Sequence, residues 1–496
     1  MTDLQRILKA GRPLTLASVP AGFTPLLVAD LARGAKGATL YIAPDDAAMR
    51  SLADTIPFFA PELEILQFPA WDCLPYDRAS PSTVITSQRM ATLNALQHPT
   101  KSKRVLLATI GAMIQRVLTP FRIRQTGAIL ASGVSINREK LASLLQANGY
   151  FRVDTVAEAG EFAIRGSLVD LIPAGSDDGL RLDFFGDELE TIRRFSPQDQ
   201  RSIGTVDRFA LLPAVETLMD EDAVRRFRTQ YRDLFGTTAT GDPLYQAVSE
   251  GRRLAGMDHW LPLFEERLVT LLDHLDSDTL ILRDQAALAA GEARFEAIAD
   301  YHANREKAQS ASPGSYRPLA PDKLYLGSDE LEALLDAHNS HLLTPFAAPE
   351  AADTIDFGIS AGRDFAPERA RKDNVYEAVS AYLKDSIRSG QKAIVASYSA
   401  GARERLKGLL SDHGAPKLVE ADGWQAALGA AAGKSAAMVV LPIDHGFASP
   451  DVALVSEQDI LGDRLVRRRK NKKSADAFLA EMAALTPGDL IVHVEH

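Results

Sequence analysis

Two short stretches carry residue types that nucleotide chemistry uses, and neither has the complete pattern. A phosphate-binding loop needs glycines for close backbone approach, a lysine for the phosphates and a Ser or Thr hydroxyl for magnesium. Residues 20–25 (PAGFTP) precede a helical pattern but contain one glycine, a lone threonine and no lysine. Residues 429–435 (GAAAGKS) are one residue short of the spacing and lie before a strand pattern. We therefore expect no catalytic residue, cofactor or metal in this chain of 496 residues.

Residues 162–195 indicate a recognition function instead, because strand periodicity leaves an unusual outward face. Side chains alternate along a strand, and one set suits a core: Leu180, Leu182 and Phe184. The other set faces outward: Arg181, Asp183 and Phe185. The Gly186-Asp187 pair that follows predicts a hairpin turn.

The preceding run, residues 162–172, supplies a further arginine. If this run is one strand, Arg165 lies on the face that carries Ser167, close to the outward residues where the strands pair. A patch of arginine, phenylalanine and arginine is typical of a protein-binding hot spot. Because both point away from their own core, we expect Arg181 and Phe185 to be replaceable without loss of stability. The alternative is that Phe185 packs against a neighbouring domain and the arginines are merely solvated.

Composition limits the other functions that the chain can have. A length of 496 residues suggests roughly three to five domains, and a net charge of -11 argues against a general nucleic-acid coat. Cys73 is the single cysteine, which excludes an internal disulfide framework and fits a reducing, cytoplasmic location. No apolar run is long enough for a membrane span, so we expect no membrane partner.

One strongly basic run stands out in the acidic chain. Residues 464–473 hold seven cations and no acid, namely Arg464, Arg467, Arg468, Arg469, Lys470, Lys472 and Lys473. Such a run is either a solvated linker or an electrostatic contact with DNA phosphates or an acidic partner.

The remaining elements indicate a multidomain α/β chain. Apolar runs typical of buried parallel strands cover 14–19, 39–43, 64–68 and 104–109. Helices are expected at 25–33 and 83–96, then at 221–235 and 284–304, with acids such as Glu265 and Glu266 on solvated faces. A second α/β pattern runs from a helix at 372–389 through strands at 392–397, 417–420 and 437–441, with a helix at 403–410.

Several motifs together resemble one family. They are FPAWDCLPYDRASPS at 68–82, ATIGAMIQRVLTP at 108–120, RGSLVDLIP at 165–173, RLDFFGDELETIRRF at 181–195, SEQDILGDRLVRRRK at 456–470 and PGDLIVHVEH at 487–496. In this order they are similar to the N-terminal half of the bacterial transcription-repair coupling factors, the Mfd family, whose first module resembles the excision-repair protein UvrB.

The resemblance implies a fold and a domain plan. The fold is multidomain α/β, with a degenerate nucleotide-binding-like parallel sheet, an inserted β-rich domain and a second small α/β domain. The implied ranges are a UvrB-like domain 1a without phosphate loop (1–125), the inserted UvrA-binding domain 2 (126–212), domain 1b (213–350), the small α/β domain 3 (351–460), a basic linker (461–485) and the start of an RNA-polymerase-interacting domain (486–496).

The resemblance also implies partners. The family couples ATP- and magnesium-dependent translocation on double-stranded DNA to displacement of RNA polymerase and recruitment of UvrA. The sequence ends before that motor, and before the domain that masks the UvrA surface in the family, so we expect an accessible, non-hydrolysing adaptor. The residues that match the family's UvrA surface are Arg165, Arg181 and Phe185. Two alternatives remain, an active UvrB-like helicase subunit and a structural clamp with no UvrA role.

Overall fold

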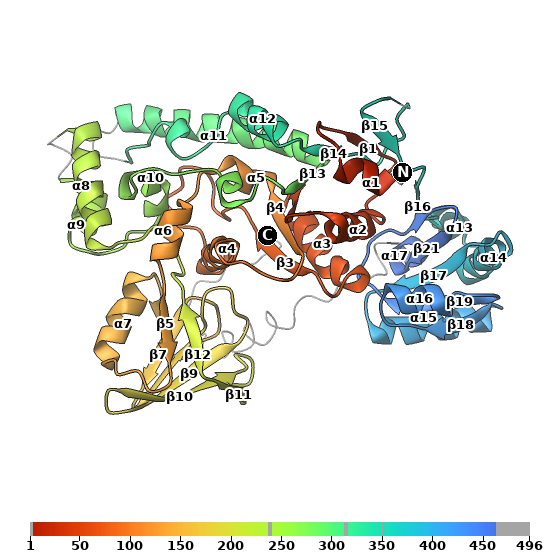
Figure 1. Cartoon of the computed structure of the whole chain (residues 1–496), viewed down its shortest axis with the longest axis horizontal. Helices are drawn as coiled ribbons and strands as arrows, with labels where there is room; N and C mark the ends of the chain where they lie inside the picture. Colours follow the sequence, from red (N-terminus) through yellow and green to blue (C-terminus); the bar gives the residue numbers. More distant parts are fainter. Residues whose placement is uncertain (1–2, 237–240, 312–315, 350, 463–496) are drawn as a thin grey trace.

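The computed structural model describes residues 3–236, 241–311, 316–349 and 351–462, and its strands build three main sheets. Figure 1 shows a central α/β unit, a β-rich unit that projects from its lower left and a second α/β unit at its right. The multidomain α/β fold predicted from the sequence is thereby confirmed.

The central unit is built on a seven-stranded sheet in which every pairing is parallel. Its order is β15-β1-β14-β13-β2-β4-β3. The bounds are β1 (Thr15–Ala17), β2 (Thr39–Ala43), β3 (Glu64–Phe68), β4 (Arg104–Thr109), β13 (Leu280–Asp284), β14 (His341–Leu343) and β15 (Thr354–Asp356). Strands from before and after the insertion thus pair with one another in one sheet, so the two segments fold as one unit.

The segment after the insertion contains the expected helices and also supplies the strands β13 and β14 of the sheet. Two other expectations about this unit were wrong. The unit also continues past residue 350, because Leu16 of β1 pairs with Ile355 of β15. Glu265, expected on a solvated face, is 5% exposed and pairs with Arg122.

Helices cover both faces of the seven-stranded sheet. Those before the insertion are α1 (Asp3–Leu8), α2 (Thr24–Gly34), α3 (Asp46–Phe59), α4 (Thr83–Leu96), α5 (Ile110–Ile114) and α6 (Pro120–Gln125). Those after it are α8 (Glu221–Phe235), α9 (Pro243–Ser249), α10 (Leu261–Phe264), α11 (Ala286–Ala311) and α12 (Ser328–Ala337). Asp45 and Ser82 cap α3 and α4 through their side chains, which satisfies backbone N–H groups that have no partner in the helix.

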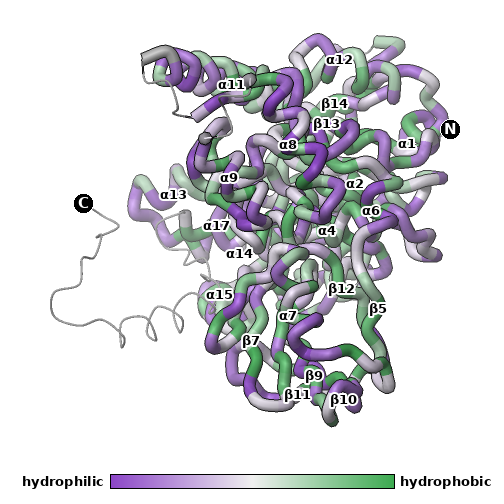
Figure 2. The backbone as a smooth tube through the Cα atoms, turned by 90° about the vertical axis from the view of Figure 1, so that its left-hand side faces the viewer, coloured by the Kyte–Doolittle hydropathy of each residue, from purple (hydrophilic) through white to green (hydrophobic). Residues whose placement is uncertain are grey.

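The inserted unit has a six-stranded sheet of order β11-β10-β9-β8-β7-β6 and a two-stranded ribbon of β5 and β12. The bounds are β5 (Ala128–Ala131), β6 (Phe151–Arg152), β7 (Glu161–Arg165), β8 (Leu168–Leu171), β9 (Gly179–Phe185), β10 (Glu188–Phe195), β11 (Ser202–Val206) and β12 (Arg208–Leu211). Helix α7 (Arg138–Ala147) packs Leu141 and Leu145 onto the face that buries Leu182. Figure 2 shows β9, β10 and β11 at the end of the molecule farthest from α11 and α12.

The third unit is a six-stranded mixed sheet of order β16-β20-β21-β17-β19-β18. Its strands are β16 (Ser360–Ala361), β17 (Lys392–Ser397), β18 (Lys417–Glu420), β19 (Ser435–Val440), β20 (Phe447–Ala448) and β21 (Val452–Ser456). Its helices are α13 (Ala366–Arg371), α14 (Val375–Arg388), α15 (Ala400–Asp412), α16 (Trp424–Ala430) and α17 (Glu457–Leu461). The helix expected at 372–389 is α14, but it begins only at Val375, because Lys372 adopts a left-handed conformation (φ 59°) that ends the preceding α13.

A buried ion pair fixes the place where the chain returns from the inserted unit to the central one. Arg89 of α4 and Glu216, which follows the insertion, are 0% and 1% exposed, and two hydrogen bonds of 2.7 and 3.1 Å join them. The Arg89 guanidinium also donates to the Pro69 carbonyl and lies 4.1 Å from the centre of the Phe68 ring. Trp71 Nε1 donates to the same Glu216 carboxylate at 2.7 Å. The charges are therefore paired and hydrogen-bonded, as burial requires.

Two glycines bring the inserted unit against α4. A side chain at Gly160 would lie 2.1 Å from Thr83 Cγ2, and one at Gly175 would lie 2.2 Å from Ala91 Cβ. Both glycines also have positive φ, a conformation that other residues rarely adopt. The inserted unit therefore packs directly against helix α4 of the central unit.

Replacing Arg89 with Ala should lower the free energy of unfolding by about 3–5 kcal/mol, because Glu216 would be left buried without its counter-charge. Urea denaturation can follow Trp71, which touches the pair, in a background with Trp260→Phe and Trp424→Phe. Arg50→Ala removes an arginine that is 60% exposed and is the matched control, with an expected change within about 0.5 kcal/mol. Equal urea midpoints for the two variants would contradict the role of the pair.

Candidate protein-recognition site

The strand registers place the predicted recognition residues on one face of the six-stranded sheet. Phe185 ends β9, and the tight turn at Gly186-Asp187 returns the chain so that Glu188 pairs with Phe185. Across the sheet, Arg165 pairs with Leu168 and Leu168 pairs with Asp183. Because directly paired residues project to the same side, Arg165, Leu168 and Asp183 share a face with Arg181 and Phe185. We call these five residues the Phe185 face.

Phe185 is the exposed aromatic residue of this face. Its side chain is 76% exposed, whereas Leu182 and Phe184 on the opposite side are buried. The predicted alternation of core and outward residues in β9 is thus confirmed. A phenylalanine with this much exposure contributes little to its own core, and an exposed aromatic that shares a face with arginines is the composition of an interface anchor.

Arg181 is held more firmly than its predicted outward position suggested. Its guanidinium donates to both carboxylate oxygens of Asp170, at 2.7 and 2.9 Å, and it lies 4.9 Å from the centre of the Phe195 ring. The Arg181 side chain is 18% exposed and that of Asp170 only 3%. The hydrogen bond to Asp170 raises the pKa of Arg181 above its usual value. Because Arg181 neutralises a buried acid, we now expect its removal to reduce stability, contrary to the expectation from sequence.

Arg165 lies at a turn that the sequence pattern did not predict. Residues 162–172 are two strands and not one, because Gly166 takes a positive φ of 60° and closes a hairpin between β7 and β8. The exposed Arg165 guanidinium donates to the Asp154 carbonyl at 2.5 Å and to Thr155 Oγ1 at 2.6 Å. These hydrogen bonds hold the 153–156 loop beside the face. They also fix the Arg165 side chain, so a partner could bind it without a large side-chain rearrangement.

Two further residues that sequence reasoning did not single out shape the site. Asp170 holds Arg181, and Arg193 of β10 pairs with Asp183 at 2.9 Å. The only sequence signal for Asp170 is that it is a lone acid inside an apolar strand run, LVDLIP. Such an acid requires a partner when buried, but the identity of that partner depends on strand register.

The loop at Pro20–Pro25 lies at the carboxyl ends of the parallel strands, as a nucleotide site would. A cleft of about 730 Å³ opens there between the central and third units. Four of its lining residues are acids, namely Asp45, Asp54, Asp284 and Asp444, and its basic residues are Arg50 and His445. Burial raises the pKa of Asp54, and burial followed by Asp284 raises that of Tyr41, which donates to Asp284 at 2.7 Å.

The third unit packs directly on this loop. A side-chain carbon at Gly22 would lie 2.3 Å from the carbonyl oxygen of His445 and 2.5 Å from that of Gly446. The ring of the next residue, Phe23, lies 5.4 Å from that of Phe447 and 5.8 Å from that of Phe357. Backbone and aromatic rings of the third unit therefore contact the loop where backbone N–H groups would face phosphates.

The other sequence candidates lie away from both of these regions. Residues 429–435 end α16 and lead into β19, which is the reverse of the strand-to-helix order that a phosphate loop needs. The seven cations of 464–473 lie outside the described residues. Within the described ranges, no three His, Cys, Asp or Glu side chains come together as metal ligands would. The helices described there include none with the length and apolar character to cross a membrane.

Comparison with known proteins defines the class to which this architecture belongs. Residues 129–216 match the family described as the UvrB interaction domain, and residues 388–460 match the D3 domain of MFD. The first match spans the sheet that bears the Phe185 face.

Curated relatives then identify the family. The chain is 32% identical, over 98% of its length, to the transcription-repair-coupling factor of Escherichia coli, and 29% identical, over 97%, to that of Haemophilus influenzae. It spans 42% and 41% of those relatives, or about two fifths of their length. The chain corresponds to the N-terminal half of the transcription-repair-coupling factors, which confirms the resemblance carried by its motifs.

Replacing Arg181 with Ala should lower the free energy of unfolding by about 2 kcal/mol or more, because Asp170 would stay buried without its partner. Phe185→Ala, three-quarters exposed, should change it by less than about 0.5 kcal/mol. Thermal unfolding followed by circular dichroism separates the two. The double variant Asp170→Ala with Arg181→Ala is expected to recover part of the stability, and failure of Arg181→Ala to shift the transition would show that the pair is dispensable.

Proposed function

We propose that this stretch is an adaptor that recruits UvrA through the Phe185 face. The observation that carries the proposal is the 76% exposure of Phe185 on the sheet face that also holds the anchored Arg165 and Arg181. The match of residues 129–216 to a UvrB interaction domain supports it, since UvrB and the coupling factors would then use one type of surface for the same partner.

The electrostatics of the face favour an acidic or polar partner surface. Arg181 is neutralised by Asp170, and Arg193 by Asp183. Arg165, in contrast, donates to neutral oxygens of Asp154 and Thr155, so its charge is not cancelled by those contacts. A partner that buries Phe185 and places a carboxylate at Arg165 would form a charge-assisted hydrogen bond. The structural-clamp alternative requires Phe185 to be buried between domains, which its exposure contradicts.

We also propose that this stretch uses no ATP, magnesium or other cofactor. No lysine lines the cleft beside the Pro20–Pro25 loop, and its four aspartates outnumber its basic residues, Arg50 and His445. An excess of carboxylates repels a triphosphate. The contact of Gly22 with residues 445 and 446 further restricts approach to the loop. An active UvrB-like helicase would need the opposite arrangement.

The wider activity belongs to the proposal as well. The relatives are named transcription-repair-coupling factors, and the chain spans about two fifths of them. We propose that RNA polymerase displacement and ATP-driven movement on double-stranded DNA depend on other segments of such a protein. In this arrangement the present stretch contributes recruitment of the repair machinery.

Phe185→Ala and Arg165→Ala should each weaken binding of purified UvrA by at least about tenfold, since central aromatic and arginine anchors typically contribute about 2 kcal/mol or more. Biolayer interferometry with this chain immobilised measures the affinity. Phe346→Ala is the matched control, because Phe346 is also largely exposed but belongs to the central unit. Unchanged binding by Phe185→Ala, or an equal loss with Phe346→Ala, would overturn the assignment.

A fluorescent ATP analogue titrated with the purified chain should give no saturable signal, because the cleft offers carboxylates where phosphates need cations. A known phosphate-loop ATPase run in parallel verifies the probe. Saturable micromolar binding that unlabelled ATP competes away would contradict the proposal, without affecting the test of UvrA binding.

A further inference from the structure

A small basic pocket lies at the end of the central sheet opposite the Pro20–Pro25 loop. It has a volume of about 450 Å³ and is lined by Arg6, Lys9, Ala10, Gly11, Arg12, Leu14 and Ala352. Leu14 immediately precedes β1 and Ala352 lies just before β15, so the pocket borders the amino ends of these two parallel strands. It is therefore separate from the cleft at their carboxyl ends.

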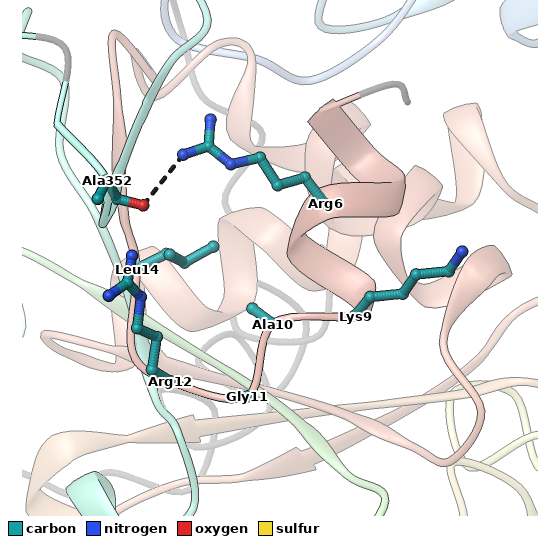
Figure 3. Close-up of a pocket in the computed structure, with 7 residues that line it drawn as sticks. All are labelled: Arg6, Lys9, Ala10, Gly11, Arg12, Leu14 and Ala352. Carbon is teal, nitrogen blue, oxygen red and sulfur yellow. Dashed lines mark hydrogen bonds between the residues drawn. The ribbon is translucent and has the colours of Figure 1, made fainter.

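Three cations line this pocket, and its lining contains no acid. Figure 3 shows Arg6 extending toward Ala352 and Arg12 lying beside Leu14, whereas the Lys9 side chain extends to the opposite side, away from this wall. Arg6 donates one hydrogen bond of 3.1 Å to the Ala352 carbonyl, which fixes its guanidinium and leaves its other N–H donors available. All three side chains are exposed, and among the described residues none of the three forms an ion pair.

No ion pair among the described residues neutralises Arg6, Lys9 or Arg12, although Asp3 lies one turn before Arg6 in α1 and Asp353 follows Ala352. His341 lies behind the wall and accepts a hydrogen bond from the Leu14 amide through Nδ1. Burial lowers the pKa of His341 to about 4, so it is neutral at physiological pH. In a chain of net charge -11, three cations that form no ion pair and line one pocket favour a local positive potential, which attracts anions.

The lining chemistry distinguishes between anions. No aromatic ring lines the pocket on which a base could stack, and its wall and floor are the aliphatic side chains of Ala10, Leu14 and Ala352 with the backbone of Gly11. A nucleotide or a sequence-specific site needs base contacts. Arginine forks and a lysine on an open surface, in contrast, suit phosphate oxygens that are presented in succession along a strand.

We infer that the Arg6–Lys9–Arg12 pocket is a sequence-independent contact for the phosphodiester backbone of double-stranded DNA. The pocket lies on the central unit and the Phe185 face on the inserted unit, so DNA binding at the pocket does not depend on UvrA binding at the face. The pocket is also distinct in sequence from the basic run at 464–473, and both can contribute to one salt-sensitive interaction. The pocket would hold the N-terminal unit against DNA while the Phe185 face stays free for a protein partner.

The test is fluorescence anisotropy of a short labelled DNA duplex, with the full chain titrated between about 50 and 200 mM KCl. Arg6→Gln, Lys9→Gln and Arg12→Gln are combined in one variant, once with the 464–473 run intact and once with its seven cations replaced by Gln. In both backgrounds the affinity at low salt should fall roughly tenfold. The slope of log K against log salt is negative, and its magnitude should decrease by about 0.9 for each phosphate that the variant no longer neutralises, up to about 2.7.

The matched control replaces three exposed lysines of the third unit, Lys372, Lys384 and Lys417, with Gln. It changes the net charge equally and should leave most of the affinity intact. A Lys9→Gln, Arg12→Gln variant keeps the Arg6 bond to Ala352, so weaker binding by that variant cannot come from α1 detaching. Circular dichroism verifies that each variant is folded.

Three outcomes would overturn the inference. They are unchanged DNA affinity and salt slope in the triple variant, an equal reduction in the lysine control, and binding of polyglutamate that equals DNA binding and falls by the same factor. The last outcome would identify the pocket as a contact for an acidic protein.

Discussion

The Arg89–Glu216 ion pair is the constraint on which the arrangement of this molecule depends. Arg89 comes before the insertion and Glu216 after it, so one buried contact closes the whole inserted unit into a loop on the central sheet. The Thr86 and Ser87 hydroxyls donate to the Ala214 carbonyl and reinforce the same joint. An ion pair with both partners out of water tolerates little displacement. The orientation of the Phe185 face relative to the central unit is therefore set by chemistry remote from that face.

Sequence periodicity predicted most of the local structure and little of the pairing. The strands at 39–43, 64–68 and 104–109 and the helices at 83–96 and 221–235 agree with the structure because each is a regular pattern within one segment. Strand β14 has only three residues and was not predicted, since its place in the sheet depends on pairing with β1, at the beginning of the chain, and with β13. The hairpin at Gly166 was not predicted either, because a glycine inside an apolar run also fits a continuous strand.

The candidate site divides in the same way. Alternation alone predicted the outward position of Phe185, since it needs only the period of one strand. The burial of Arg181 was not predictable, because it depends on Asp170 lying opposite in β8, across a connection from residue 172 to residue 178. Glu265 shows the same limit, because Arg122, its partner, is supplied by a helix on the other side of the insertion. Alternation within one strand predicts which side chains share a face. The pairing of that strand with its neighbours determines which charged side chains on the face are already in ion pairs.

Gly22 shows that a glycine can be sterically required in a loop of this kind without binding a phosphate. In a phosphate loop a glycine is required because the backbone must approach the ligand closely. Here the backbone at His445 and Gly446 occupies the space that a side chain at position 22 would need. Position 22 therefore has no space for a side chain. The group that fills this space is the backbone of the third unit and not a bound phosphate. A mutational scan of this loop would show intolerance at Gly22 that resembles an active-site signature while reporting only interdomain packing.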